Sequence, residues 1–190
     1  YLQTDGYGAY THFGKNKEIT MVCCMAHARR KFKDALDQKN ENAQEAMELF
    51  GELYAVERIA REKELDYAAR LALRQELSIP ILNRLHEYLM RQAQDPSLVP
   101  KSLMSKALNY TLKLWGRLNE FTKNGMLEID NNWVENKIRP VALGRRNYMF
   151  CGSHEAAQRA AMMYSLLAMC AIANVNPQDW LTDVLLRINE

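Results

Sequence analysis

Apolar positions change their spacing along this chain, and the changes mark the elements that the sequence predicts. Residues 1–4 lead into an Asp-Gly pair, which predicts the end of a strand followed by a turn. Residues 18–25, EITMVCCM, are apolar and partly β-branched, as in a short buried strand. From His27 the spacing becomes that of a basic amphipathic helix, AHARRKFKDAL.

The middle of the chain has a helical pattern throughout. Residues 41–76 are rich in Glu, Ala, Leu and Arg with apolar positions at helical spacing, which predicts two helical segments. SIPILNRLHEYLMRQA continues as helix, with Pro80 placed early, where proline is tolerated. After a break at DPSLVP, a further helix is predicted up to the pair Asn124-Gly125. The sequence therefore predicts a helical block without strands over about residues 37–124.

Two helices are predicted near the C-terminus. Ser153 and Asn176 are suitable N-cap residues because their side-chain oxygens accept backbone N–H groups. Pro177 directly after the second cap favours a helix start at that point.

Composition and charge narrow the possible classes of protein. Hydrophobic residues make up 48% of the 190 residues, which is enough for a globular core. The formal net charge is +2, so any nucleic-acid signal must be local rather than global. We find no apolar run of about 18 residues and expect no membrane span. The four cysteines lack zinc-site spacing and a disulfide pattern, which favours a reducing cytoplasm.

Asp5 is the first candidate for chemistry. It follows a predicted strand, and carboxylates at strand ends point into the crevice where α/β enzymes bind ligands. The structural alternative is that Asp-Gly is a common turn pair.

The second candidate lies in EIDNNWVENKIRP, where Asp130, Asn131, Asn132 and Glu135 stand close together. A carboxylate here is a candidate metal ligand. The structural alternative is a helix start, with an asparagine cap and Glu135 completing a capping box. We expect such a helix to be short, since Pro140 interrupts it.

Two basic clusters are candidates for phosphate contacts. HARRKF places a histidine and three cations near one helical turn, at the helix start, where the helix dipole does not favour cations. IRPVALGRRNYMFCGS has the pattern of a turn near a phosphate backbone, followed by rings that can stack. The alternatives are a solvated basic face and a hairpin with exposed arginines. The candidates are His27, Arg29, Arg30, Lys31, Arg139, Arg145 and Arg146.

Three motifs in order carry a resemblance: LQTDGYGAY, CMAHARRKF and DNNWVENKIRPVALGRRNYMFCGSHEAAQRAAMMYSLL. Together they resemble the C-terminal part of the catalytic region of bacterial insertion-sequence transposases of family sixty-six. The resemblance implies an α/β class, with a partial ribonuclease-H-like fold that is mostly helical here because of a large all-helical insertion. It implies that residues 1–36 are part of the catalytic core, 37–124 the insertion, and 125–190 the remaining core and C-terminal helices.

The same resemblance implies DDE chemistry on DNA, with phosphodiester hydrolysis and strand transfer at transposon ends. In such enzymes two aspartates and one glutamate hold two divalent ions, Mg²⁺ or Mn²⁺. Asp5 and Glu135 match two of these ligands; the first catalytic aspartate is expected upstream of Tyr1, in a longer protein. The supporting residues that the resemblance implies are Asp130, Asn131, Asn132 and Asn136.

The implied partners are DNA, as transposon ends and target, and other protomers in a homo-oligomer on DNA. The implied location is the bacterial cytoplasm at the nucleoid, without a membrane. One alternative is a catalytically inactive remnant that acts only in DNA binding or protein association. Another is an all-helical interaction module without a nucleic-acid role.

Overall fold

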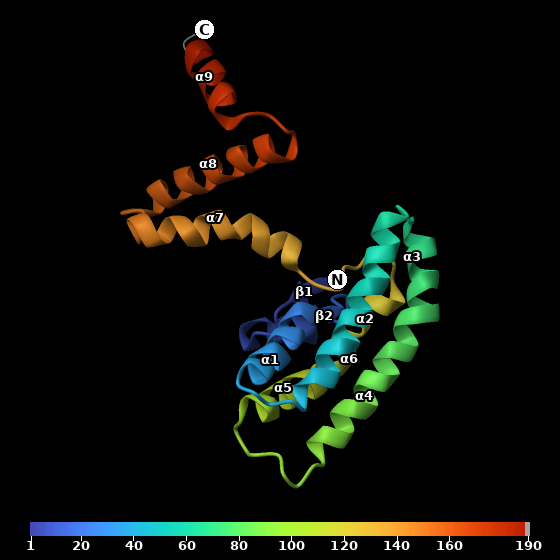
Figure 1. Cartoon of the computed structure of the whole chain (residues 1–190). Coiled ribbons are helices and arrows are strands. Elements are labelled where there is room, and N and C mark those ends of the chain that lie inside the picture. The colour runs from blue at the N-terminus through green and yellow to red at the C-terminus, as the bar shows by residue number, and fades with distance from the viewer. Residues whose placement is uncertain (189–190) are drawn as a thin grey trace. The chain divides into compact units, whose positions relative to one another are not determined.

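A computed structural model describes residues 1–188, and the chain divides into two compact units, Tyr1–Asn131 and Asn132–Glu190. Figure 1 labels their helices and strands.

The first unit contains a small parallel sheet. Strand β1 (Leu2–Thr4) pairs with β2 (Met21–Cys23), and Leu2 lies opposite Met21 in the register. All of β2 is buried, as its continuous apolar run predicts. The connection between the strands includes a 3₁₀ helix, η1 (Gly8–Lys15). Both predicted strands are thus confirmed.

Helices pack against this sheet and against one another. Helix α1 lies against α2 and α5, and α2 also lies against α4. Residues 37–124 contain no strand, as the sequence pattern predicts. The helices of the first unit are α1 (Met25–Asp37), α2 (Ala43–Glu62), α3 (Tyr67–Leu73), η2 (Arg74–Ser78), α4 (Ile79–Ala93), α5 (Leu103–Lys113), α6 (Trp115–Leu118) and η3 (Glu120–Lys123).

The apolar core of the first unit joins α1, α2, α4 and α5. Phe32 of α1 and Phe50 of α2 are fully buried, and their ring centroids are 5.7 Å apart. Tyr88 of α4 lies beside Phe32, with its hydroxyl donating to the carbonyl oxygen of Asn42. The helical spacing of apolar residues therefore places large side chains from separate helices in one cluster.

A buried group of charges lies beside this apolar core. Arg74, in the π-helical turn η2, is 0% exposed, and Glu57 of α2 is 1% exposed. The guanidinium donates two hydrogen bonds to the Glu57 carboxylate, at 2.7 and 2.8 Å. It also donates to the carbonyl oxygens of Phe121 and Asn124, at 2.9 and 3.2 Å. These bonds satisfy the desolvated charges and join α2, η2, η3 and the residue that follows η3.

Gly125 shows how closely the chain after η3 approaches α3. A Cβ atom at this position would lie 1.8 Å from the carbonyl oxygen of Tyr67, so any larger residue would force the backbones apart. The Asn124-Gly125 pair ends the helical block, as predicted, and also allows this close approach.

The second unit contains three helices among its described residues: α7 (Asn132–Tyr148), α8 (His154–Ile172) and α9 (Pro177–Arg187). The two predicted caps are confirmed. Ser153 accepts the backbone N–H of Ala156, and Asn176 accepts that of Gln178.

The prediction that Pro140 cuts the preceding helix short is wrong. Helix α7 continues through Pro140 to Tyr148. A proline removes one helical hydrogen bond and favours a kink, and helical residues on both sides keep the remaining bonds. As a consequence, Arg145 and Arg146 lie in the last turn of a helix rather than in a turn or hairpin.

We predict that Glu57→Gln lowers the free energy of unfolding of this chain by about 3 kcal/mol, because it leaves the buried Arg74 charge without its counter-ion. Urea unfolding followed by circular dichroism measures this change. The matched control is Glu52→Gln, which breaks an exposed pair with Arg84 and should cost about 1 kcal/mol or less. Equal effects of both variants would contradict a structural role for the buried pair.

Candidate functional site

Asp5 lies at the carboxyl edge of the parallel sheet, directly after β1. Its carboxylate oxygen Oδ1 accepts the backbone N–H of Tyr7 at 2.8 Å, which closes a turn. Gly6 has φ of +83°, and its N–H donates to the Thr4 hydroxyl at 3.2 Å. The prediction that Asp5 and Gly6 form a turn is therefore confirmed. The same turn holds the half-buried Asp5 carboxylate at the end of the strand.

The helical block supports this strand end from one side. The Tyr110 hydroxyl of α5 donates to the main-chain carbonyl oxygen of Asp5 at 2.5 Å. The Lys31 ammonium of α1 lies 4.7 Å from the centre of the same tyrosine ring. The position of Asp5 thus depends on α5, which is far away in the sequence.

Asp130 lies beside the same edge of the sheet, near the start of α1. Main-chain bonds hold the residues on either side of it: Met25 N–H donates to the carbonyl oxygen of Ile129 at 3.0 Å, and Asn131 N–H donates to Cys24 Sγ at 3.5 Å. Cys24 directly follows β2, and carboxyl ends of parallel strands share one edge. The sequence candidates Asp5, Asp130 and Asn131 therefore lie in one unit, with Asp5 and Cys24 following neighbouring strands.

The Tyr54 hydroxyl of α2 donates to Asp130 Oδ2 at 2.9 Å. Burial, together with the nearby Asp130 charge, raises the pKa of Tyr54 well above its usual range, so this hydroxyl stays protonated and donates. Burial also raises the pKa of the Cys24 thiol, which stays neutral beside Asp130.

Glu128 lies two residues before Asp130 and is joined through Arg70 to the buried charge of Glu57. Arg70 of α3 donates to both carboxylate oxygens of Glu128, at 2.7 and 2.8 Å, and also to Glu57 at 2.9 Å. The side-chain amide of Gln3 in β1 donates to the Glu128 carbonyl oxygen at 2.9 Å. The hydrogen bonds from Arg70 lower the pKa of Glu128 below its usual value, although burial opposes this shift. Residues 128–131 are consequently tied to β1, α1, α2 and α3.

The first basic cluster lies on α1. Arg29 and Arg30 are exposed, whereas His27 and Lys31 are half-buried. The Arg29 guanidinium also lies over the Tyr54 ring, with its central carbon 5.9 Å from the ring centre. The cluster combines exposed cations with cations that pack on tyrosines of the helical block.

The remaining sequence candidates belong to the second unit. Glu135 lies in the first turn of α7 and is half-buried, and Asn132, next to the unit boundary, is exposed. Arg139 and Arg146 follow four and eleven residues after Glu135, spacings that place all three on one face of the helix. Other exposed polar candidates on α7 are Asn136 and Arg145.

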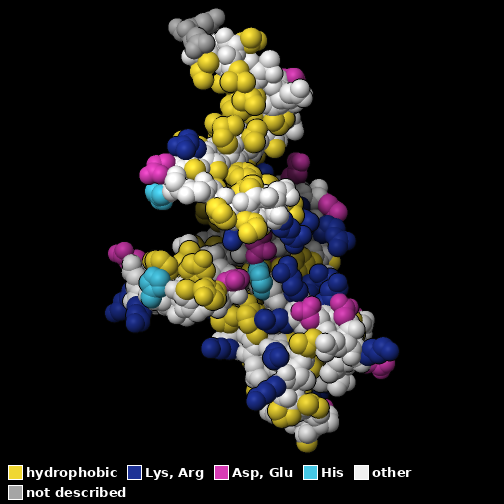
Figure 2. Space-filling model, turned by 90° about the vertical axis from the view of Figure 1, so that its left-hand side faces the viewer, with side chains coloured by type: hydrophobic (Ala, Val, Ile, Leu, Met, Phe, Trp, Pro, Cys, Tyr) yellow, Lys and Arg dark blue, Asp and Glu magenta, His cyan; other side chains and the backbone are white. Residues whose placement is uncertain are grey.

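Apolar side chains are also exposed on the second unit. Trp133 is 70% exposed, with the Lys137 ammonium 5.3 Å from its ring centre. Met169 and Leu186 are also exposed, and Figure 2 shows hydrophobic side chains gathered on the surface of the C-terminal helices. An exposed apolar surface of this kind is typical of an interaction site.

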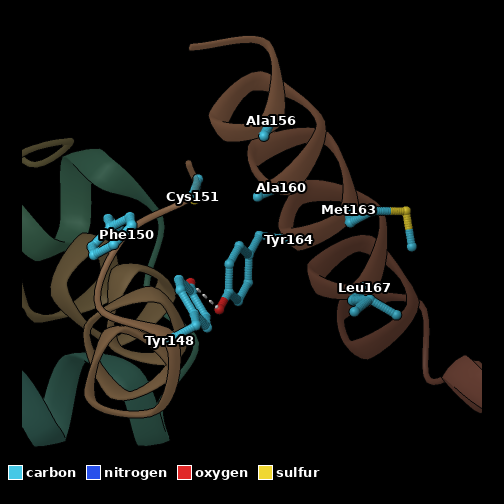
Figure 3. Close-up of a pocket in the computed structure, with 8 residues that line it drawn as sticks. All are labelled: Tyr148, Phe150, Cys151, Ala156, Ala160, Met163, Tyr164 and Leu167. Atoms are coloured by element: carbon cyan, nitrogen blue, oxygen red, sulfur yellow. Dashed lines mark hydrogen bonds between the residues drawn. The ribbon is translucent and has the colours of Figure 1, made fainter. Parts of the chain in front are cut away.

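A largely apolar cavity of about 500 Å³ lies between the end of α7 and α8 (Figure 3). The Tyr148 and Tyr164 hydroxyl oxygens are 2.9 Å apart and form a hydrogen bond across it. The rings predicted to stack therefore differ in their surroundings, since Tyr148 is tied to α8 and Phe150 is 75% exposed. The cavity is lined by Tyr148, Phe150, Cys151, Ala156, Ala160, Met163, Tyr164 and Leu167.

Carboxylate oxygens are the donors that Mg²⁺ and Mn²⁺ prefer, so the candidate acids have suitable chemistry. Among residues 1–188, however, no group of three or more His, Cys, Asp or Glu residues forms a metal site. Asp5 belongs to the first unit and Glu135 to the second.

In the described part of the chain, no helix has the length and apolarity needed to cross a membrane.

Sequence reasoning missed the residues that hold the acids in place. Tyr54, Tyr110, Glu57 and Arg70 all lie in the helical block, where their positions read as ordinary helix faces. The sequence did contain one indication of the buried network: Glu57, Arg70 and Arg74 lie within an apolar helical pattern, and buried charges require partners.

A family model described as "Transposase IS66 family" matches residues 1–159. Uncharacterized protein y4hP of Sinorhizobium fredii (strain NBRC 101917 / NGR234) is 37% identical over 98% of this chain and 36% of its own length. Uncharacterized protein y4jD of the same strain is 36% identical over 98% of this chain and 37% of its own length. The chain thus spans little more than a third of these relatives. No solved structure matches it.

We predict that Glu128→Gln reduces stability in a pH-dependent way. The folded-state pKa of Glu128 is lowered, so its contribution is complete above the ordinary value of 4.5 and disappears as pH falls through the folded-state pKa. The variant should be less stable than the parent by about 1 kcal/mol or less at pH 7, because the carboxylate is partly exposed. Urea midpoints across pH 2.5–7 measure this, and a difference that persists at the acid end would contradict it.

Proposed function

The chain belongs to the IS66 family of transposases, and we propose that it forms part of the catalytic region of an enzyme that cuts and joins DNA at transposon ends. The observation that carries this proposal is the acidic sheet edge of the first unit. Asp5 and Asp130 are both held there by hydrogen bonds from the helical block, one through its main chain and one through its carboxylate.

In this proposal β1, β2 and α1 belong to a ribonuclease-H-like core, and residues 37–124 are an insertion that packs on it. Residues 125–190 supply the rest of the core and the C-terminal helices. The parallel pairing of β1 with β2 supports the assignment, because ligands in α/β folds bind at the carboxyl ends of parallel strands.

Asp5 and Glu135 are the proposed metal ligands, completed by a first aspartate from the longer protein. Bound Mg²⁺ or Mn²⁺ would stabilise charge on the attacking and leaving oxygens of a phosphodiester. The chain's own residues position these acids: the turn at Gly6 and the Tyr110 hydroxyl fix Asp5. Asp130, Asn131, Asn132 and Asn136 are proposed to support Glu135.

The proposed DNA contacts come from both basic clusters. Arg29 and Arg30 are exposed on α1, beside His27 and Lys31. On α7, Arg139 and Arg146 share a helix face with Glu135, so phosphates bound along this face would pass the catalytic carboxylate. Arg145 adds a further exposed cation in the last turn.

The exposed apolar surface of the second unit supports a protein partner. We propose that other parts of the longer transposase, or further protomers on DNA, cover it.

We predict that Glu135→Gln in the full-length transposase abolishes strand cleavage and leaves the affinity for transposon-end DNA within about twofold. The substitution removes a proposed metal-binding charge and keeps the side-chain shape. A gel assay with Mg²⁺ measures cleavage, and fluorescence anisotropy measures binding. Glu155→Gln is the matched control, since Glu155 occupies the first turn of α8 as Glu135 does in α7. Cleavage at the parent rate by Glu135→Gln would remove this residue from the active site.

We predict that the double variant Arg145→Ala/Arg146→Ala binds DNA more weakly and with a shallower salt dependence. Loss of two phosphate contacts should reduce the slope of log K against log salt by about 2. Affinities measured between 50 and 200 mM salt give the slope. The control is Arg84→Ala/Arg91→Ala, which removes two exposed arginines that pair with glutamates of α2. An unchanged slope in the α7 variant would exclude the phosphate role.

A further inference from the structure

We infer that Tyr54 is a positioning residue for the transposase reaction: it acts through Asp130 and so makes α2 of the helical block part of the active-site support. This inference rests on the proposed function. It assigns the block a role in the reaction in addition to its place in the core.

The contact itself is specific. Tyr54 is half-buried, and its hydroxyl donates to Asp130 Oδ2 at 2.9 Å across 76 residues of sequence. The Arg29 guanidinium lies over the same ring, so the tyrosine joins an acid at the sheet edge to the basic cluster of α1. A hydrogen bond to an ionised carboxylate is stronger than one between neutral groups.

Helix α2 holds this acidic segment at two points. Glu57 lies one turn after Tyr54 and binds Arg70, which in turn binds Glu128. Residues 54 and 57 share one face of the helix, so both contacts come from the same side of α2. Two contacts from one helix face, one direct and one through Arg70, thus help to hold the segment that carries Asp130.

Main-chain bonds at Ile129 and Asn131 hold the backbone of this segment, but they do not orient the Asp130 carboxylate. The hydroxyl of Tyr54 acts on that side chain directly. Glu135, the proposed catalytic glutamate, follows only five residues after Asp130 in the sequence. Greater mobility of the Asp130 segment would therefore also increase the mobility of the residues that lead to Glu135. This is why we expect an effect on turnover rather than on DNA binding.

The first test is Tyr54→Phe in the full-length transposase. We expect kcat for strand cleavage to fall about tenfold, the scale set by one hydrogen bond to a charged group, with DNA affinity within about twofold. Hydrogen–deuterium exchange should rise in peptides covering residues 128–135. The matched control is Tyr88→Phe, which removes a hydroxyl bonded to the Asn42 carbonyl oxygen inside the core and should change neither readout.

The second test is a double-mutant cycle with Asp130→Asn. If Tyr54 acts through Asp130, the double variant should be no slower than Asp130→Asn alone, whereas independent effects would multiply. Multiplying effects, parent-level exchange or parent-level kcat in Tyr54→Phe would each overturn the inference. If Tyr54→Phe gives one of these results and Glu135→Gln is inactive, only the inference about Tyr54 fails and the proposed function stands. If Glu135→Gln cleaves DNA at the parent rate, the proposed function itself fails.

Discussion

The first unit depends on one buried charge pair. Arg74 and Glu57 are almost completely removed from water, and such a pair is tolerated only when every polar group finds a partner. Arg74 meets this condition by bonding to Glu57 and to the carbonyl oxygens of Phe121, in η3, and Asn124, directly after it. The pair therefore joins α2 and η2 to the chain at Phe121 and Asn124.

The same pair sets the geometry of the acidic edge. Glu57 shares its carboxylate with Arg70, and Arg70 holds Glu128 two residues before Asp130. The buried Arg74–Glu57 pair, Arg70 and Glu128 are thus consecutive members of one hydrogen-bonded chain, which ends two residues before Asp130. A change in the packing of α2 against η2 is therefore expected to displace Glu128 and the segment after it.

Local features of the sequence predicted much of the structure. Ser153 and Asn176 cap helices as predicted, because capping depends on a few neighbouring backbone groups. The short helix expected at Pro140 is wrong, since the local preference of proline is outweighed by the helical turns on either side of it. The hydrogen bond from Tyr54 to Asp130 could not be predicted from the sequence for a different reason. Its partner lies 76 residues away, and no local pattern marks a tyrosine on a helix face as a donor to a distant carboxylate.

Several candidate residues have a structural role at the positions where a functional role is proposed. Asp5 closes a turn, Glu135 lies in the first turn of α7, where the helix dipole favours an acid, and Arg146 lies in its last turn, where the dipole favours a cation. A charge placed in this way is compatible with folding and remains available to a ligand. Stability measurements alone therefore cannot separate the two roles at these positions. Only a readout that involves DNA distinguishes them, because the structural role of each residue is already present without it.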